Sequence, residues 1–194
     1  MAVTWQELPK PLQAVLGNGV SALVDLYGSA AASGALLPPE EDAAEAGLRF
    51  VAADGAGDAE VVGTVVPAGR GIVSFVAASG IALVVADVQQ DPRFDRALAE
   101  STGYVPRTIL AAPLVTSGEV LGVVEVLDPS RRTRDLDLLA SWASLLAGVL
   151  GVVTPATGRL VRTAQRVETE HPEARELGAD LLETLVRARA RPLR

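Results

Sequence analysis

Two charged side chains lie in otherwise apolar stretches of the sequence, where they could bind a ligand or pair with each other. Arg107 opens an apolar segment, and a guanidinium there could form paired hydrogen bonds with a carboxylate or phosphate. The alternative is a structural tie to Asp87 or to a loop carbonyl. Glu125 interrupts a second apolar segment, and a buried carboxylate is costly unless it has a partner. We therefore expect Glu125 either to face water or to meet a partner such as Arg107.

Four further residues belong to the candidate set. Asp87 ends the apolar stretch 81–86, and we expect its carboxylate to accept backbone hydrogen bonds from the loop that follows. Phe75, Phe94 and Tyr104 are three of only five Phe and Tyr residues in the chain. Such side chains could pack against a ligand, but in so aromatic-poor a sequence they could equally fill the core.

The residues needed for common catalytic sites are nearly absent. The sequence has no cysteine and one histidine, His171, which excludes thiolate nucleophiles, disulfides and multi-histidine metal sites. It has neither a Gly-x-Ser-x-Gly elbow nor a Gly-x-x-x-x-Gly-Lys phosphate loop. We expect a protein that is not an enzyme and holds no metal.

Charge and hydropathy narrow the range of partners. The net charge is −7, and an acidic globule repels phosphate backbones, so we expect no nucleic-acid partner. The longest uncharged apolar run, residues 138–153, is shorter than the roughly 20 residues needed to span a bilayer. No signal peptide is evident at the start of the sequence. We expect a cytoplasmic protein that does not bind membranes.

The middle of the chain predicts an α+β domain whose strongest strands pair antiparallel. Residues 107–115 and 120–127 are joined by only four residues, and a parallel pair would need a long crossover. The other elements expected are strands at 48–53, 60–66 and 81–86, a helix at 72–78 and a short helix that starts at Asp91.

Helices are expected on both sides of this middle region. An apolar stripe with three- and four-residue spacing runs from Leu12 to Ala30, and residues 33–45 have the composition of a loop. Thr133 can cap a helix whose apolar stripe, from Leu136 to Val153, is too wide for contact with a sheet alone. We therefore expect this helix to meet the first one and a second subunit, giving a homodimer.

At this point the middle of the chain resembles the GAF family of sensory α+β modules. Five stretches follow the order and spacing of that family's motifs: Gly69-Arg70-Gly71-Ile72-Val73, Leu83 to Phe94, Arg107 to Leu114, Val120 to Val126, and the helix from Asp135 to Leu150. The resemblance implies an antiparallel sheet with the N- and C-terminal helices on one face and a loop-covered pocket on the other. It divides the chain into residues 1–44, a GAF-like domain at 45–153 and a helical extension at 154–194.

The resemblance also implies which residues line the pocket and which cofactors are absent. It places the aromatic residues around the pocket and Arg107 with Thr108 near its mouth; the candidate ligand-binding set is Phe75, Asp87, Phe94, Tyr104, Arg107, Thr108 and Glu125. Cyclic-nucleotide-binding members carry Asn-Lys where this chain has Asp128-Pro129, so the resemblance does not favour a cyclic nucleotide as the ligand. Bilin attachment and the methionine sulfoxide reductase mechanism use cysteine, and haem-binding members use a histidine within the domain. We expect no cofactor.

These observations lead to two functional hypotheses. In the first, the protein is a non-catalytic sensory module that binds a small molecule and signals through its dimer helices to a separate regulatory protein. In the second, it is a ligand-free dimerisation and interaction scaffold that docks a partner through residues 155–194.

Overall fold

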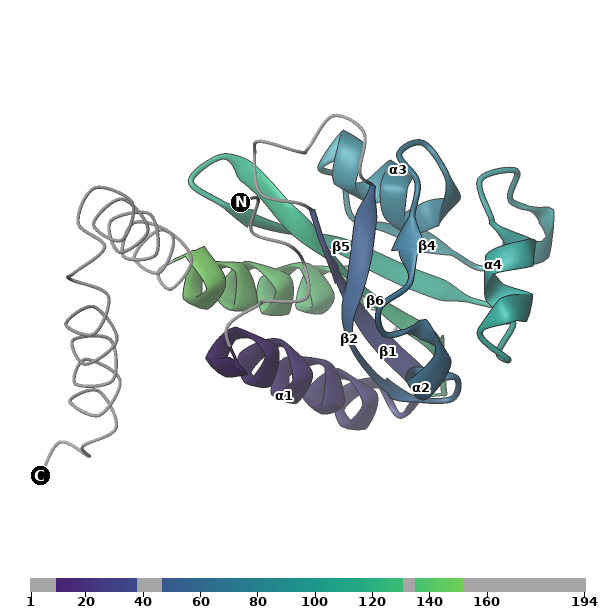
Figure 1. Ribbon diagram of the computed structural model, residues 1–194, viewed down its shortest axis with the longest axis horizontal. Coiled ribbons are helices and arrows are strands. Elements are labelled where there is room, and N and C mark those ends of the chain that lie inside the picture. The colour runs from purple at the N-terminus through teal and green to yellow at the C-terminus, as the bar shows by residue number, and fades with distance from the viewer. Residues whose placement is uncertain (1–9, 38–46, 131–134, 152–194) are drawn as a thin grey trace, which may run out of the picture. The chain divides into compact units, whose positions relative to one another are not determined.

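The computed structural model describes residues 10–37, 47–130 and 135–151, all within one compact unit (Figure 1). Its centre is a six-stranded sheet in the order β3-β2-β1-β6-β5-β4, and every neighbouring pair is antiparallel. The strands are β1 (Ser29–Leu36), β2 (Leu48–Gly55), β3 (Val65–Val66), β4 (Leu83–Val85), β5 (Ile109–Thr116) and β6 (Glu119–Pro129). The predicted antiparallel α+β fold is confirmed.

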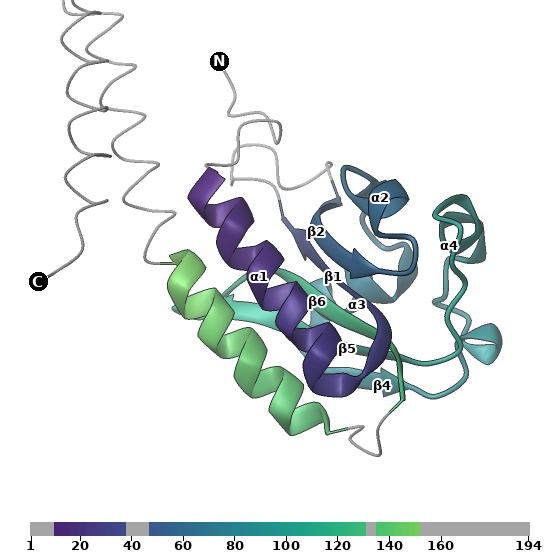
Figure 2. The ribbon, with the colours of Figure 1, turned by 90° about the horizontal axis from the view of Figure 1, so that it is seen from below.

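Helices cover both faces of the sheet (Figures 1 and 2). On one face, α1 (Lys10–Tyr27) lies beside the helix formed by residues 136–151. On the other face lie the shorter helices α2 (Asp58–Val61), α3 (Gly71–Ser79) and α4 (Arg96–Ser101), together with the 3-10 turn η2 (Val88–Gln90). The two long helices therefore leave the opposite face of the sheet to short helices and loops.

The contact between the two long helices was predicted from the width of the second stripe, and the structure confirms it. Trp142 donates its indole N–H to the carbonyl of Gly19 at 3.2 Å, and the hydroxyl of Tyr27 donates to the carbonyl of Asp135 at 2.7 Å. A Cβ at Gly19 would lie 2.6 Å from Cδ2 of Leu146, so the two helices approach closely here and a larger residue would force the Leu146 side chain to shift. The Asp135 carboxylate accepts the Leu138 N–H at 3.1 Å and so caps helix 136–151; Thr133, the predicted cap, lies outside the described residues.

Strand β1 was missed by the sequence analysis, and the predicted loop at 33–45 is wrong for residues 33–36. The strand consists of Ala, Ser, Gly and one Leu, and residues 31–36 are buried. At Gly34, a Cβ would lie 3.1 Å from Cγ of Leu16, so α1 packs directly on this strand. The small residues of β1 let α1 approach the strand closely. β1 lies in the middle of the sheet although its residues have little preference for strands. The sheet therefore starts before residue 45, the predicted domain boundary.

Three smaller predictions are also corrected. The expected strand at 60–66 is helical at its start, in α2, and extended only at Val65 and Val66. The strand expected at 81–86 is limited to residues 83–85. The short helix begins at Arg96, where the Asp95 carboxylate accepts the Leu98 N–H at 3.2 Å, and not at Asp91.

The β5–β6 hairpin and helix α3 agree with expectation. Ser117 and Gly118 form the hairpin loop with φ of 51° and 83°, the left-handed geometry of a two-residue type I′ turn. Helix α3 ends at Gly80, whose φ of 67° is that of a glycine cap.

Candidate functional site

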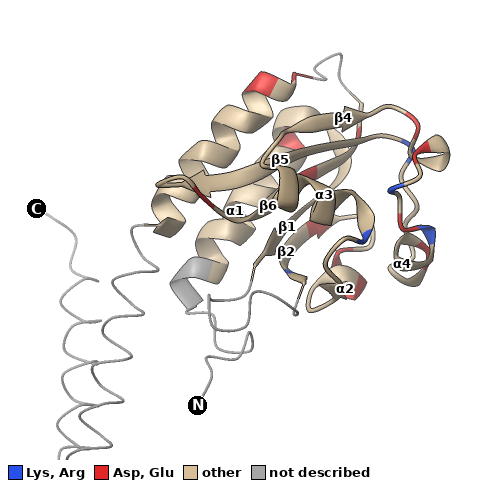
Figure 3. Cartoon of the chain, turned by 90° about the horizontal axis from the view of Figure 1, so that it is seen from above, with Lys and Arg blue, Asp and Glu red and all other residues tan. Residues whose placement is uncertain are grey.

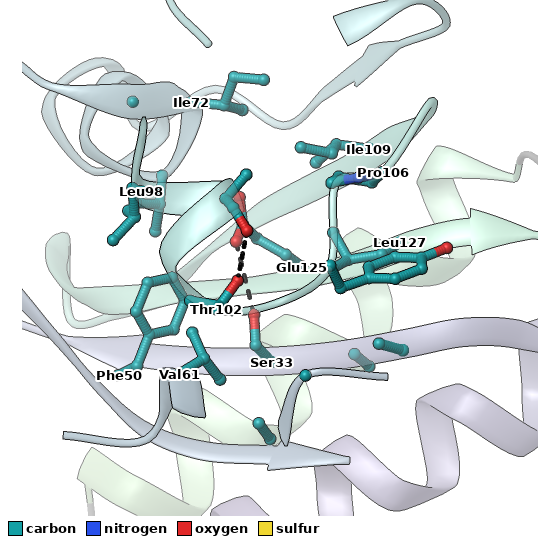
Figure 4. Close-up of a pocket in the computed structure, with 18 of the residues that line it drawn as sticks. Ser33, Phe50, Val61, Ile72, Leu98, Thr102, Pro106, Ile109, Glu125 and Leu127 are labelled. Carbon is teal, nitrogen blue, oxygen red and sulfur yellow. Dashed lines mark hydrogen bonds between the residues drawn. The ribbon is translucent and has the colours of Figure 1, made fainter. Parts of the chain in front are cut away.

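A cavity of about 90 Å³ lies between the sheet and the short helices (Figure 4). One water needs roughly 10–15 Å³ by the same measure, so the space admits a small molecule. The floor comes from strands β1, β2, β5 and β6, and the cover comes from α2, α3, α4 and the segment 102–106. Its apolar wall is formed by Phe50, Val61, Ile72, Val73, Phe94, Leu98, Pro106, Ile109, Leu127 and several alanines.

Glu125 is the buried charge-bearing group of this cavity. It lies on β6 between Ser33 of β1 and Ala111 of β5, and only 7% of it is exposed. Ser33 Oγ donates to its Oε2 at 3.4 Å, and the structure gives no other hydrogen bond to this carboxyl from the described residues. Burial raises the pKa of Glu125 from 4.5 to about 7, an effect that the hydrogen bond from Ser33 opposes. The side chain can therefore exchange a proton near neutral pH.

The prediction that Arg107 meets Glu125 is wrong. Arg107 is exposed, does not line the cavity and precedes β5, whereas Glu125 is buried in the middle of β6. It is the backbone N–H of Arg107 that makes a structural contact, 2.9 Å from Oδ1 of Asp128. The alternative prediction, a tie of the Arg107 guanidinium to Asp87 or to a loop carbonyl, is also wrong, because the group that is bound is the main-chain N–H and its partner is Asp128.

Asp128 holds the segment that closes one side of the cavity. Its carboxylate accepts the Tyr104 hydroxyl at 2.6 Å and the backbone N–H of Thr108 at 2.7 Å, in addition to that of Arg107. The residue has a φ of 50°, a left-handed conformation that Asp tolerates better than most residues. Burial and the Asp128 carboxylate raise the pKa of Tyr104 to about 12. In the sequence Asp128 stands out only as a departure from the family pattern, and this structural role could not be predicted from it.

The structure divides the seven candidate residues into three groups. Phe94, Tyr104 and Glu125 line the cavity. Thr108 is buried outside it, and its hydroxyl donates to the carbonyl of Ala86 at 3.2 Å. The other three, Phe75, Asp87 and Arg107, are exposed and do not line the cavity.

Phe75 and Asp87 have identifiable structural roles. The guanidinium carbon of Arg93 lies 4.4 Å from the centroid of the Phe75 ring, within the range of a cation–π contact. Arg93 also forms a salt bridge of 2.6 Å with Asp91 and lowers the pKa of that carboxyl. Asp87 accepts the Gln89 N–H at 3.3 Å, as predicted for a carboxylate at the end of a strand. These contacts hold the β4–α4 connection together.

The lining of the cavity contains carboxylates but no cation. Asp54 and Asp95 join Glu125 there, and no Lys, Arg or His belongs to the described residues that form the wall. Asp95 is neutralised by Arg70, whose Nη2 lies 2.8 Å from Oδ2 of Asp95. Figure 3 shows the basic residues of the described chain chiefly around α4 and the neighbouring loops. Apart from the Tyr104 phenol, the ionisable side chains of the described wall are therefore carboxyl groups.

Within residues 10–37, 47–130 and 135–151, no three Asp, Glu or His side chains are arranged to hold a metal ion. No helix in that part of the chain is long and apolar enough to cross a bilayer.

Comparison with known proteins gives a consistent family and fold. A model of the GAF domain matches residues 11–150. The mouse (Mus musculus) cone cGMP-specific 3′,5′-cyclic phosphodiesterase subunit alpha′ is 36% identical over 97 residues, which are 48% of this chain and 11% of that protein. The chain therefore spans about a tenth of the length of this curated relative.

Solved structures extend the likeness at lower identity. The GAF domain of a phosphoenolpyruvate-protein phosphotransferase from Coxiella burnetii has a TM-score of 0.65 at 18% identity and covers 79% of this chain and 89% of its own. Free methionine-R-sulfoxide reductase from Neisseria meningitidis, solved in complex with its substrate, has a TM-score of 0.59 at 23% identity, covering 75% and 81%. These two structures are evidence of shared fold.

Proposed function

Since the chain belongs to the GAF domain family, a family of sensory and regulatory modules in signalling proteins, we propose that it binds a small molecule in the cavity above Glu125 and passes the signal to another protein. The observation that carries this proposal is the buried Glu125 carboxyl in a cavity with an otherwise largely apolar wall. A few polar groups in a mostly apolar cleft are typical of small-molecule sites. Phe50, Phe94 and Tyr104 supply aromatic surface around the ligand.

A thermal-shift screen with a matched pair of variants tests ligand binding. A ligand that binds only the folded state stabilises it by about 2.7 kcal/mol at a hundred times its Kd. Ala53 lines the cavity opposite Ser33, so Ala53→Leu should fill the space and abolish the shift. Ala59 is exposed on α2 and outside the lining, so Ala59→Leu should preserve it. A metabolite library that shifts neither the wild type nor Ala59→Leu would refute the proposal.

The proposed route of the signal is the pair of long helices. Leu145 and Val149 lie one turn apart on helix 136–151 and are 66% and 39% exposed. Two exposed apolar residues on one helical face support a homodimer contact there. Leu145→Glu should convert a dimer to a monomer in light scattering, whereas Ser144→Glu, at the exposed position beside it, should not. A wild-type mass of one subunit, about 20 kDa at micromolar concentration, would rule out this contact.

The exposed apolar face formed by Leu145 and Val149 also supports a second function, that of a ligand-free interaction scaffold. In that case residues 155–194, which lie outside the described part, capture the partner. Their deletion should abolish capture and leave the domain folded, and the metabolite screen should give no shift. Retained capture after the deletion would refute this version.

We further propose that the module is not an enzyme and holds no cofactor. The reductase of similar fold acts on methionine sulfoxide, and the family resemblance assigns that chemistry to cysteines, which this chain lacks. Incubation of the protein with free methionine sulfoxide and a thiol reductant should therefore yield no methionine. Turnover at a rate above the protein-free control would overturn this part of the proposal.

A further inference from the structure

The hydrogen-bonding groups of the cavity restrict the chemistry of its ligand. The three hydroxyl groups in the wall already donate to acceptors of the protein: Ser33 to Glu125, Thr102 to the carbonyl of Ala99 at 2.9 Å, and Tyr104 to Asp128. Each hydroxyl has one hydrogen to donate. When Glu125 is ionised, the side chains of the described wall therefore offer acceptors to a ligand and keep no free donor.

The most buried carboxyl of the described wall is that of Glu125. Ser33 reaches only its Oε2, and the hydrogen bond is long at 3.4 Å, so Oε1 has no donor among the described residues (Figure 4). Burying a carboxylate oxygen that has no hydrogen-bond donor costs free energy. A cation that donates a hydrogen bond to this oxygen could recover that free energy. Asp54, half-buried in the same wall, adds a second carboxylate, and none of the described residues that line the cavity is a cation that could offset either charge.

We infer, on the basis of the proposed function, that the cavity selects a small ligand with a protonated amine or a similar N–H cation attached to an apolar body, with Glu125 as its counter-ion. The aromatic and aliphatic wall would hold the apolar body. An anion such as a phosphate or a cyclic nucleotide would meet carboxylates without a compensating donor from any side chain of the wall. Charge-assisted hydrogen bonds to an ammonium are stronger than those to a neutral donor.

Two series of matched probes test this selectivity by NMR titration of the amide resonances around the cavity. One series is benzylamine, benzyl alcohol and benzoate; the other is isobutylamine, isobutanol and isobutyrate. Within each series the size is nearly constant and the charge changes. We expect each amine to bind at least about tenfold more tightly than its alcohol and each carboxylate to bind more weakly still.

Glu125→Gln keeps the shape of the side chain and removes its charge. It should weaken amine binding by about tenfold or more and change alcohol binding by less than about threefold. Glu119→Gln removes an exposed charge at the start of the same strand and should leave both unchanged. Amine binding should also strengthen from pH 5 to pH 8 as Glu125 loses its proton; the other titratable groups of the wall are Asp54, Asp95 with its partner Arg70, and Tyr104.

The outcomes separate this inference from the proposed function. Alcohols or carboxylates that bind in the cavity as tightly as the amines, or amine binding that Glu125→Gln leaves intact, would overturn the inference and leave small-molecule binding in place. Perturbed resonances confined to surfaces away from the cavity, for all six probes, would count against both.

Discussion

Replacement of Glu125 by glutamine should stabilise the protein at alkaline pH and change its stability little at acidic pH. The Glu125 carboxyl is buried and accepts one long hydrogen bond, so its charged form is disfavoured in the folded state. Glutamine has the same shape and no charge to bury. The comparison therefore isolates the cost of ionising this one group.

The direction and size of the effect follow from the pKa. A carboxyl whose pKa is 4.5 when unfolded and about 7 when folded binds more protons in the folded state between these two values. The stability of the wild type must therefore fall, relative to Glu125→Gln, as pH rises from about 4.5 to about 7, and then level off. At about 1.4 kcal/mol per pH unit of separation, the total is on the order of 3 kcal/mol.

Urea denaturation of wild type and Glu125→Gln at pH 5, 6, 7 and 8 measures this difference. Other groups titrate alike in both proteins, so they cancel when the two free energies of unfolding are subtracted. Glu119→Gln is the matched control, because it removes an exposed charge from the same strand, and its pH profile should follow that of the wild type. A free-energy difference between wild type and Glu125→Gln that stays constant from pH 5 to pH 8 would refute the reasoning, since Glu125 would then ionise as easily folded as unfolded.

Two further predictions concern helix packing and the tyrosines. Gly17→Ala should stabilise the protein by about 0.5–1 kcal/mol, because nothing lies within 4 Å of the new Cβ and alanine favours the helix. Gly19→Ala should destabilise it by about 1–2 kcal/mol in the same denaturation assay, because the new Cβ would lie 2.6 Å from Leu146; equal effects of the two substitutions would contradict the packing. The pKa values of Tyr27 and Tyr104 are both raised, chiefly by burial, so the ultraviolet absorbance of tyrosinate should stay low at pH 10 in the folded protein and appear on unfolding. Stability should correspondingly fall as pH rises from 10 towards 12, and half of the tyrosine ionised at pH 10 in folded protein would contradict this.

The elements with strong local signals could be predicted from the sequence. Residues 107–115 and 120–127 are rich in β-branched and apolar residues with a tight turn between them, and they form the β5–β6 hairpin. Strand β1 gave no such signal, because its alanines, serines and glycine have little preference for strands and are extended only through pairing with β2 and β6. Tertiary pairing, and not local propensity, determines this segment.

The candidate site could be predicted only in part, because some of its residues carry a local signal in the sequence and others come together only through tertiary pairing. Glu125 could be identified because a lone carboxylate in an apolar strand is either paired or functional. Its partner Ser33 could not, because the strand that carries Ser33 was not recognised. Arg107 was a reasonable choice by residue type, but sequence does not reveal that its side chain is exposed or that Asp128 binds its backbone.

Native mass spectrometry most directly tests the claim that the cavity above Glu125 is a ligand site. Wild type, Ala53→Leu and the control Ala59→Leu would each be equilibrated with a metabolite extract and sprayed without dialysis. We predict that wild type and Ala59→Leu carry the same non-covalent small-molecule adduct and that Ala53→Leu, with its cavity filled, lacks it. Identical spectra for all three proteins would contradict the account.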